Sequence, residues 1–143
     1  MISLNVHGLL KFAFGEKLII EHADKALSNT CKIHQVQIRE YTVAPDFNGA
    51  AAVGAHHWLI EFESNPSDLE AFIQTLDSQL KNENADYDAK RKGNINIGFP
   101  LVSIAAPGTF HQWLKNKGKL GGQHKIPRLL NNDTLLKEIM CQS

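Results

Sequence analysis

Residues 56–63 read His-His-Trp-Leu-Ile-Glu-Phe-Glu, and their side chains alternate between the two faces of an extended chain. Trp58, Ile60 and Phe62 share one face, which is the pattern of a strand that packs on a core. Residues 35–44 alternate in the same way, though less clearly. The two segments therefore predict an antiparallel pair of strands, with the large aromatic side chains in the core.

Helix signals lie on both sides of this strand pair. Residues 17–32 carry apolar side chains at helical spacing. Residues 65–68 read Asn-Pro-Ser-Asp, which predicts an N-cap followed by proline in the first turn of a helix with an apolar stripe. Residues 85–92 extend or restart that helix, and Thr109 and Asp133 are the predicted N-caps of two more.

Residues 100–105 (Pro-Leu-Val-Ser-Ile-Ala) form a short apolar run, which predicts a strand in the centre of the sheet. The expected order is helix, strand, strand, helix, strand, helix, helix. Because strands and helices do not strictly alternate, we predict an α+β fold, a mixed or antiparallel sheet of about three to five strands with helices packed on it. The length of 143 residues predicts a single domain over 1–143 with one core.

The chain carries 15 basic and 15 acidic residues, so it is not a strongly basic nucleic-acid binder as a whole. The charges are unevenly distributed, however. Residues 60–86 hold seven acids and one base, a balance of −6, whereas residues 87–128 hold eight bases and one acid, a balance of +7. Either the second half meets an anionic partner, or the two runs pair with each other or stay solvated.

Cys31 and Cys141 are the two cysteines, and no C-x-x-C motif occurs. We therefore expect a reducing, cytoplasmic environment. No apolar run approaches the roughly 20 residues of a membrane span, so no membrane partner is expected. The histidines show no ligand spacing, and we expect no metal site in this chain.

The most informative stretch is residues 118–129, Gly-Lys-Leu-Gly-Gly-Gln-His-Lys-Ile-Pro-Arg-Leu. The glycine pair allows close approach of a ligand to the backbone. Lys125 follows it and comes two residues before Pro127, which stiffens the chain. Such an arrangement can present one ammonium group to a phosphate or carboxylate oxygen. A solvated basic loop is the alternative.

This stretch and several others resemble the C-terminal domain of the auxin-responsive acyl-acid amido synthetases, the Gretchen Hagen family, in its bacterial branch. The matching pieces run in family order over nearly the whole chain: 14–18, 41–45, 57–62, 76–80, 84–91, 108–110, Trp113 and 118–129. The last piece and Asn-Ala-Asp-Tyr-Asp-Ala-Lys-Arg at 84–91 are the most specific.

The resemblance implies one part of a two-domain, adenylate-forming ligase. In such an enzyme a large N-terminal domain binds ATP with Mg and a carboxylic acid, and forms an acyl-adenylate. A mobile C-terminal lid domain, the part seen here, swings over that site, and an amine, typically of an amino acid, then forms the amide. The resemblance thus implies three kinds of partner, namely the N-terminal domain, the acid and the amine. It implies no cofactor bound to this part alone.

The resemblance also implies roles for individual residues. Lys125 matches the lysine that this superfamily supplies from its C-terminal domain, so it is the predicted catalytic residue. We expect five neighbours close to the nucleotide phosphates: Lys119, Gly121, Gly122, Gln123 and Arg128. Lys90 and Arg91 are candidates for contact with the partner domain, although an ion pair with the preceding acidic segment is the favoured interpretation.

Two departures from the family pattern affect the prediction. Residues 1–11, the segment expected next to the hinge, contain no Gly-Arg pair, and the N-terminal domain is not among these residues. We therefore expect no adenylation by this chain alone. The alternatives are a regulatory remnant without catalysis, or a stand-alone module that binds RNA or another anion. Against an RNA partner, no aromatic-basic RNP pattern occurs.

Overall fold

The helices and strands of the computed structural model confirm the predicted mixture of both element types. The structure describes residues 9–11, 17–46, 54–92, 97–117, 126–130 and 132–141. In chain order the elements are β1 (Leu9–Lys11), β2 (Lys17–Ile19), α1 (Ile20–His34), β3 (Ile38–Asp46), β4 (Ala55–Phe62), α2 (Leu69–Glu83), α3 (Ala85–Arg91), β5 (Leu101–Ile104), α4 (Thr109–Asn116) and α5 (Thr134–Met140).

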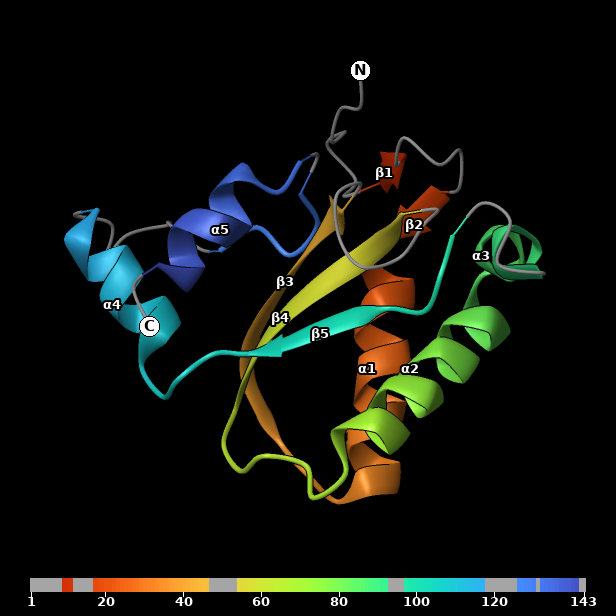
Figure 1. Cartoon of the computed structure of the whole chain (residues 1–143), viewed down its shortest axis with the longest axis horizontal. Coiled ribbons are helices and arrows are strands. Elements are labelled where there is room, and N and C mark those ends of the chain that lie inside the picture. Colours follow the sequence, from red (N-terminus) through yellow and green to blue (C-terminus); the bar gives the residue numbers. More distant parts are fainter. Residues whose placement is uncertain are drawn as a thin grey trace.

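The main sheet has the strand order β3-β4-β5 and is mixed (Figure 1). β3 and β4 are antiparallel, as predicted, and β4 and β5 are parallel. β1 and β2 form a separate antiparallel pair. The prediction that residues 100–105 lie in the centre of the sheet is wrong, because within the described residues β5 pairs with β4 alone. An apolar run indicates burial, but it does not specify how many strands flank it.

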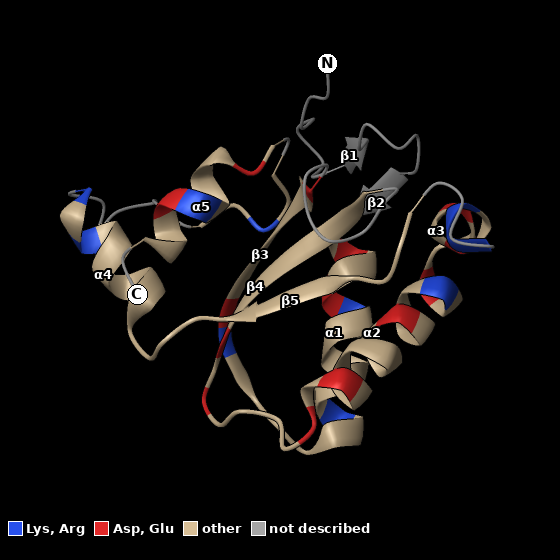
Figure 2. Ribbon diagram, in the orientation of Figure 1, with Lys and Arg blue, Asp and Glu red and all other residues tan. Residues whose placement is uncertain are grey.

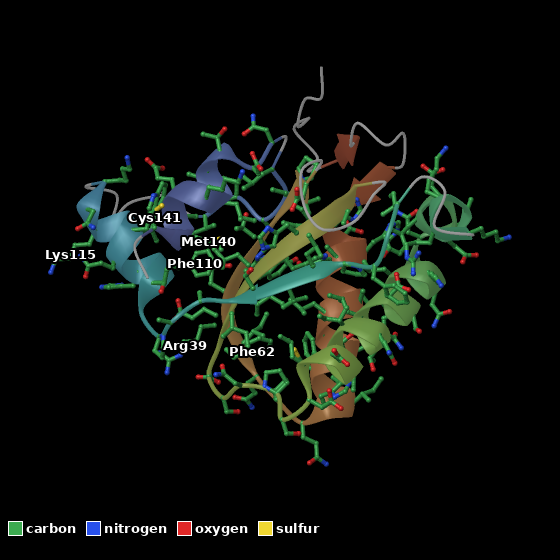
Figure 3. The ribbon with its side chains drawn as sticks, viewed as in Figure 1. Arg39, Phe62, Phe110, Lys115, Met140 and Cys141 are labelled. Atoms are coloured by element: carbon green, nitrogen blue, oxygen red, sulfur yellow. The ribbon has the colours of Figure 1, made fainter. Side chains whose placement is uncertain are left out.

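β4 is the central strand because it lies between β3 and β5, and helices cover both faces of the sheet (Figure 1). Trp58, Ile60 and Phe62 pack in a cluster with residues of α1 and α2, whereas Leu59 packs in a second cluster with residues of α4 and α5. Phe110 of α4, labelled in Figure 3, belongs to that second cluster. The predicted core residues are all buried: Trp58, Phe62, Phe72 and Trp113. The period-2 pattern of this strand thus separates two helical layers.

The predicted start of the first helix is wrong by three residues. Residues 17–19 form β2, which pairs with β1 from Lys17 opposite Lys11 to Ile19 opposite Leu9, and α1 begins at Ile20. A short strand at the start of an amphipathic run contains too few residues to interrupt the helical pattern, so periodicity alone did not separate the two. None of the described helices is long and apolar enough to cross a membrane.

Two predicted N-caps are also shifted. The N-cap of α2 is Asp68 and not Asn65, because the Asp68 carboxylate accepts the Ala71 N–H at 3.1 Å. Thr109 is the first residue of α4 and not its cap, since its hydroxyl donates to the Ala106 carbonyl at 2.7 Å. The N-cap of α4 is Gly108 with φ 86°, a left-handed conformation that favours glycine. Asp133 is the N-cap of α5, as predicted.

The hydrogen-bond acceptor for the first N–H groups of α4 is a side chain of the sheet. Glu61 of β4 is 4% exposed, and its carboxylate accepts the N–H groups of Gly108 at 3.0 Å and of Phe110 at 3.2 Å. A carboxylate at this point also matches the positive end of the helix dipole. Glu61 therefore joins α4 to the central strand.

Replacing Glu61 by alanine should lower the free energy of unfolding by about 1–3 kcal/mol, because the buried Phe110 N–H and the Gly108 N–H both lose their acceptor. Urea denaturation of the purified chain measures this. Glu63→Ala is the control, since Glu63 is exposed and its loss should change stability by less than about 0.5 kcal/mol. Equal effects of the two substitutions would show that the carboxylate of Glu61 does not cap α4.

Candidate functional site

The described part of the predicted lysine motif begins directly after the lysine. Five of the predicted site residues lie outside the described residues: Lys119, Gly121, Gly122, Gln123 and Lys125. Ile126 follows Lys125, and the chain is then described as far as Leu130. We call residues 126–130 the anchor segment, because the contacts below join it to β3.

The anchor segment runs parallel to β3 along the edge that β4 does not occupy (Figure 1). The Val43 N–H donates to the Arg128 carbonyl at 2.7 Å, and the Leu130 N–H donates to the Val43 carbonyl at 2.8 Å. Ile126 and Leu130 pack in the cluster beside α4 and α5, whereas Leu129 packs in the opposite cluster. The segment is thus held by backbone hydrogen bonds and by side chains on both faces of the sheet.

A threonine of β3 adds a third hydrogen bond to the anchor segment. The Thr42 hydroxyl donates to the Pro127 carbonyl at 2.7 Å, and Thr42 is fully buried. Pro127 has no N–H of its own and a nearly fixed φ, so few conformations remain for the chain at this point. The backbone two residues after Lys125 is therefore closely defined.

Arg128, the one predicted phosphate-proximal residue that the structure describes, lies between two carboxylates. Its guanidinium nitrogens are 3.7 Å from Asp24 of α1 and 3.6 Å from Glu40 of β3. The same group lies 5.5 Å from the centre of the Tyr41 ring, a cation–π distance. Arg128 thus connects the anchor segment to both α1 and β3.

Tyr41 contacts both the Arg128 guanidinium and the Asp24 carboxylate. Its hydroxyl donates to Asp24, and its ring stacks on Trp58 at 5.5 Å. Burial, reinforced by the hydrogen bond and the negative charge of Asp24, raises the pKa of Tyr41 far above its ordinary value. The hydroxyl therefore keeps its proton and acts as a donor to Asp24 at any physiological pH.

An open groove of about 780 Å³ lies between α1 and β3, next to Arg128. Its charged lining residues are three acids and three bases: Asp24, Glu40, Glu63, Lys32, Arg39 and Arg128. Arg39 lies where β3 begins, beside the end of β4 at Phe62 (Figure 3). Because the charges balance, the groove offers no net positive potential to an anion.

Arg91 is part of the interior and forms the ion pair that the sequence favoured. It is 4% exposed, and its guanidinium meets Asp77 of α2 through two contacts of 2.7 Å and 2.9 Å. Tyr87 also donates to Asp77, at 2.6 Å, and Arg91 donates to the Ile97 carbonyl at 3.3 Å. Lys90 beside it is half-buried, and contact of its side chain with a partner domain stays a prediction.

The motif at residues 84–91 therefore has a structural explanation. Asn84 caps α3, because its side-chain oxygen accepts the Tyr87 N–H at 2.9 Å. Tyr87 and Arg91, on the same helix, then reach Asp77. These contacts fix α3 against α2 and hold the chain that leads into β5.

The two charge runs do not form separate faces. Both signs occur on α2, α3 and α5 (Figure 2). Besides Arg91, Lys117 pairs with Glu138 at 2.9 Å and Lys137 with Asp133 at 3.0 Å. The pair of Arg91 with Asp77 joins the two runs, whereas Lys117 and Arg128 of the basic run pair with acids outside the acidic run.

Sequence reasoning missed the residues of α1 and β3 that hold the anchor segment. Asp24 and Glu40 are ordinary surface acids in the sequence, and Thr42 is one polar residue of an alternating strand. Their roles arise only where the fold brings residues 24–42 against residues 127–128. The one available signal was that residues 41–45 match the family pattern.

The family described as "GH3 family C-terminal domain" matches residues 21–134. The chain belongs to the GH3 family. The match covers α1 from its second residue, the whole main sheet and the anchor segment, so the fold is that of the GH3 C-terminal domain. No curated protein matches this GH3 chain.

Solved structures show the same GH3 fold. A structure titled "GH3.15 acyl acid amido synthetase" superposes with a TM-score of 0.69 at 22% identity, over 97% of this chain and 24% of the other. A second, "AtGH3.15 acyl acid amido synthetase in complex with 2,4-DB", gives 0.69 at 21% identity, over 99% and 26%. The GH3 domain described here thus spans about a quarter of the length of these proteins.

Proposed function

We propose that this domain is the mobile C-terminal domain of an ATP-dependent acyl-acid amido synthetase. In the first half-reaction a carboxylate oxygen of the acid attacks the α-phosphorus of ATP, and the bond to pyrophosphate breaks. In the second, an amine nitrogen attacks the acyl carbonyl, the bond to AMP breaks and the nitrogen loses a proton. ATP and the acid are substrates bound mainly by an N-terminal domain, over which this domain swings.

The observation that carries the proposal is the anchor segment next to Lys125. Three hydrogen bonds to β3 hold residues 127–130, and the predicted catalytic lysine directly precedes the anchor segment. An ammonium group attached next to such a firmly held backbone can neutralise the negative charge of the carboxylate and α-phosphate oxygens as they approach each other. The match to the GH3 C-terminal domain and the shared fold support the same role.

A polyanion-binding function has less support. Three of the six basic residues between 87 and 128 that the structure describes have acidic partners. Arg91 is buried on Asp77, Lys117 pairs with Glu138, and Arg128 lies between two carboxylates. A surface that binds nucleic acid needs cations free to contact phosphates. The ion pairs reduce the free positive charge on which that alternative depended.

The 143-residue chain on its own should catalyse no ATP–pyrophosphate exchange with any of a panel of carboxylic acids, because the proposal assigns the adenine and acid pockets to the N-terminal domain. A full-length enzyme carrying this domain is the positive control. The same enzyme cut before this domain should lose adenylation, which tests the proposed role directly. Exchange by the purified chain, or full adenylation by the shortened enzyme, would contradict the proposal.

A further inference from the structure

We propose that Arg128, Asp24, Glu40 and Thr42 form a clamp that holds the anchor segment on β3 and thereby positions Lys125 for adenylation. The inference rests on the proposed function, and it assigns these four as positioning residues. None of them need touch the substrate. They act on the backbone that leads to Lys125.

The contacts of Arg128 reach three parts of the fold. Its backbone carbonyl accepts the Val43 N–H, while its side chain meets Asp24 on α1 and Glu40 on β3. Tyr41 lies under the guanidinium and is itself bonded to Asp24. A planar guanidinium over an aromatic ring and beside two carboxylates has a more defined orientation than a lysine ammonium would have.

Thr42 holds the other end of the clamp, closer to the lysine. Its hydroxyl bonds to the Pro127 carbonyl from a fully buried position, so it is not exchanged for water at the surface. Pro127 has no N–H to donate and a nearly fixed φ. The hydrogen bond to its carbonyl is therefore the contact through which Thr42 fixes this part of the backbone. Any shift of Pro127 also shifts Ile126, the residue to which Lys125 is joined.

The clamp and a direct phosphate contact by Arg128 predict opposite effects of the same substitution. If Arg128 contacts phosphate, Asp24 and Glu40 compete for its charge, and Asp24→Asn should leave adenylation unchanged or make it faster. If Arg128 is part of a clamp, Asp24→Asn removes one of its supports and should slow adenylation. Asp24 and Glu40 lie at similar distances from the Arg128 guanidinium, 3.7 Å and 3.6 Å, so each carboxylate can act as competitor or as support.

Loss of the clamp should affect the reaction more than the fold. The side chains of Arg128 and Asp24 are 45% and 43% exposed, and ion pairs at such positions contribute little to stability. Rates, in contrast, are sensitive to small misplacements, and a shift of about 1 Å can cost about a hundredfold. A positioning role therefore predicts slow adenylation with an almost unchanged melting temperature.

The first experiment uses a full-length enzyme that carries this domain. Arg128→Ala and Asp24→Asn should each slow adenylation about 10- to 100-fold. Amide formation from a supplied acyl-adenylate should change far less, and so should the melting temperature. Lys25→Ala is the matched control, because Lys25 also lies on α1 but pairs with Glu83 of α2, at 3.7 Å. Thr42→Val should slow adenylation as Arg128→Ala does, and Thr42→Ser should restore the rate.

The second experiment uses the 143-residue chain and needs no catalysis. The Leu130 N–H, which donates to the Val43 carbonyl, should exchange with solvent about tenfold faster in Arg128→Ala and Thr42→Val than in the unchanged chain. Lys25→Ala should leave this exchange rate alone. Amides of α2 serve as the internal reference for global opening.

The outcomes separate the clamp from the function on which it rests. If Lys125→Ala abolishes adenylation but Arg128→Ala, Asp24→Asn and Thr42→Val do not slow it, the clamp is wrong and the proposed function stands. If Lys125→Ala adenylates normally, the proposed role of the lysine fails first. Faster adenylation by Asp24→Asn, or unchanged exchange at Leu130 in Arg128→Ala, would also overturn the clamp.

Discussion

In a full-length enzyme that carries this domain, Lys125→Ala should slow acyl-adenylate formation roughly a hundred- to a thousandfold. The reacting centre collects negative charge from the carboxylate and the α-phosphate, and losing one preorganised charge partner typically costs about 2.7–4 kcal/mol. Amide formation from a supplied acyl-adenylate should suffer less, since no second anion then approaches the phosphate. Rates of the two half-reactions, measured separately, test this, with the melting temperature recorded for each variant.

Lys119→Ala is the control for charge alone, because Lys119 is a basic neighbour in the same motif that does not match the lysine position. It should reduce adenylation only mildly. The assignment of Lys125 fails if its alanine variant forms adenylate at the normal rate. It fails equally if Lys119→Ala is the more damaged enzyme.

Asp77→Ala should lower the free energy of unfolding of this chain by about 3–5 kcal/mol, the usual cost of leaving one member of a buried ion pair alone. Arg91, 4% exposed, would lose its carboxylate partner, and Tyr87 would lose the acceptor for its hydroxyl. Arg91→Ala should lower the free energy of unfolding by a similar amount, because it removes the buried cationic partner of the Asp77 carboxylate. Urea denaturation at pH 7 measures both losses.

Lys81→Ala provides a matched control on the same carboxylate. The Lys81 ammonium lies 3.5 Å from Asp77, but its side chain is 37% exposed, so its removal should cost less than about 1 kcal/mol. Were Arg91→Ala no more costly than Lys81→Ala, the buried pair would not be what joins α3 to α2.

The same pair predicts how stability depends on pH. Burial by itself raises the pKa of Asp77, but hydrogen bonds from Arg91 and Tyr87 and the charges of Arg91 and Lys81 outweigh it and hold this pKa below its ordinary value. A depressed folded-state pKa means that the contribution is complete above the unfolded value of about 3.9 and is lost as the pH falls through the folded value. The difference in unfolding free energy between the native chain and Asp77→Asn should therefore shrink below about pH 4.

Local patterns predicted the elements of this fold because helix and strand periods are properties of short segments. The alternation at residues 56–63 correctly assigned Trp58 and Leu59 to opposite faces of the sheet. The apolar stripe of α2 was equally clear, although its start at Leu69 depended on which of two acceptable residues caps the helix. The sequence could not show that β5 lies at an edge of the described sheet, because strand order depends on how connections cross in space.

For the candidate site, the sequence alone determined the motif and, through the family pattern, the predicted lysine. The tertiary structure decided what the surrounding residues do. Arg91 belongs to a buried pair with Asp77 and Glu61 caps α4, neither of which a local pattern could show. Arg128 meets Asp24 across more than a hundred residues of sequence. Side chains so far apart in the chain meet only after the sheet and its helices have formed, so their pairing is a property of the fold and not of any segment.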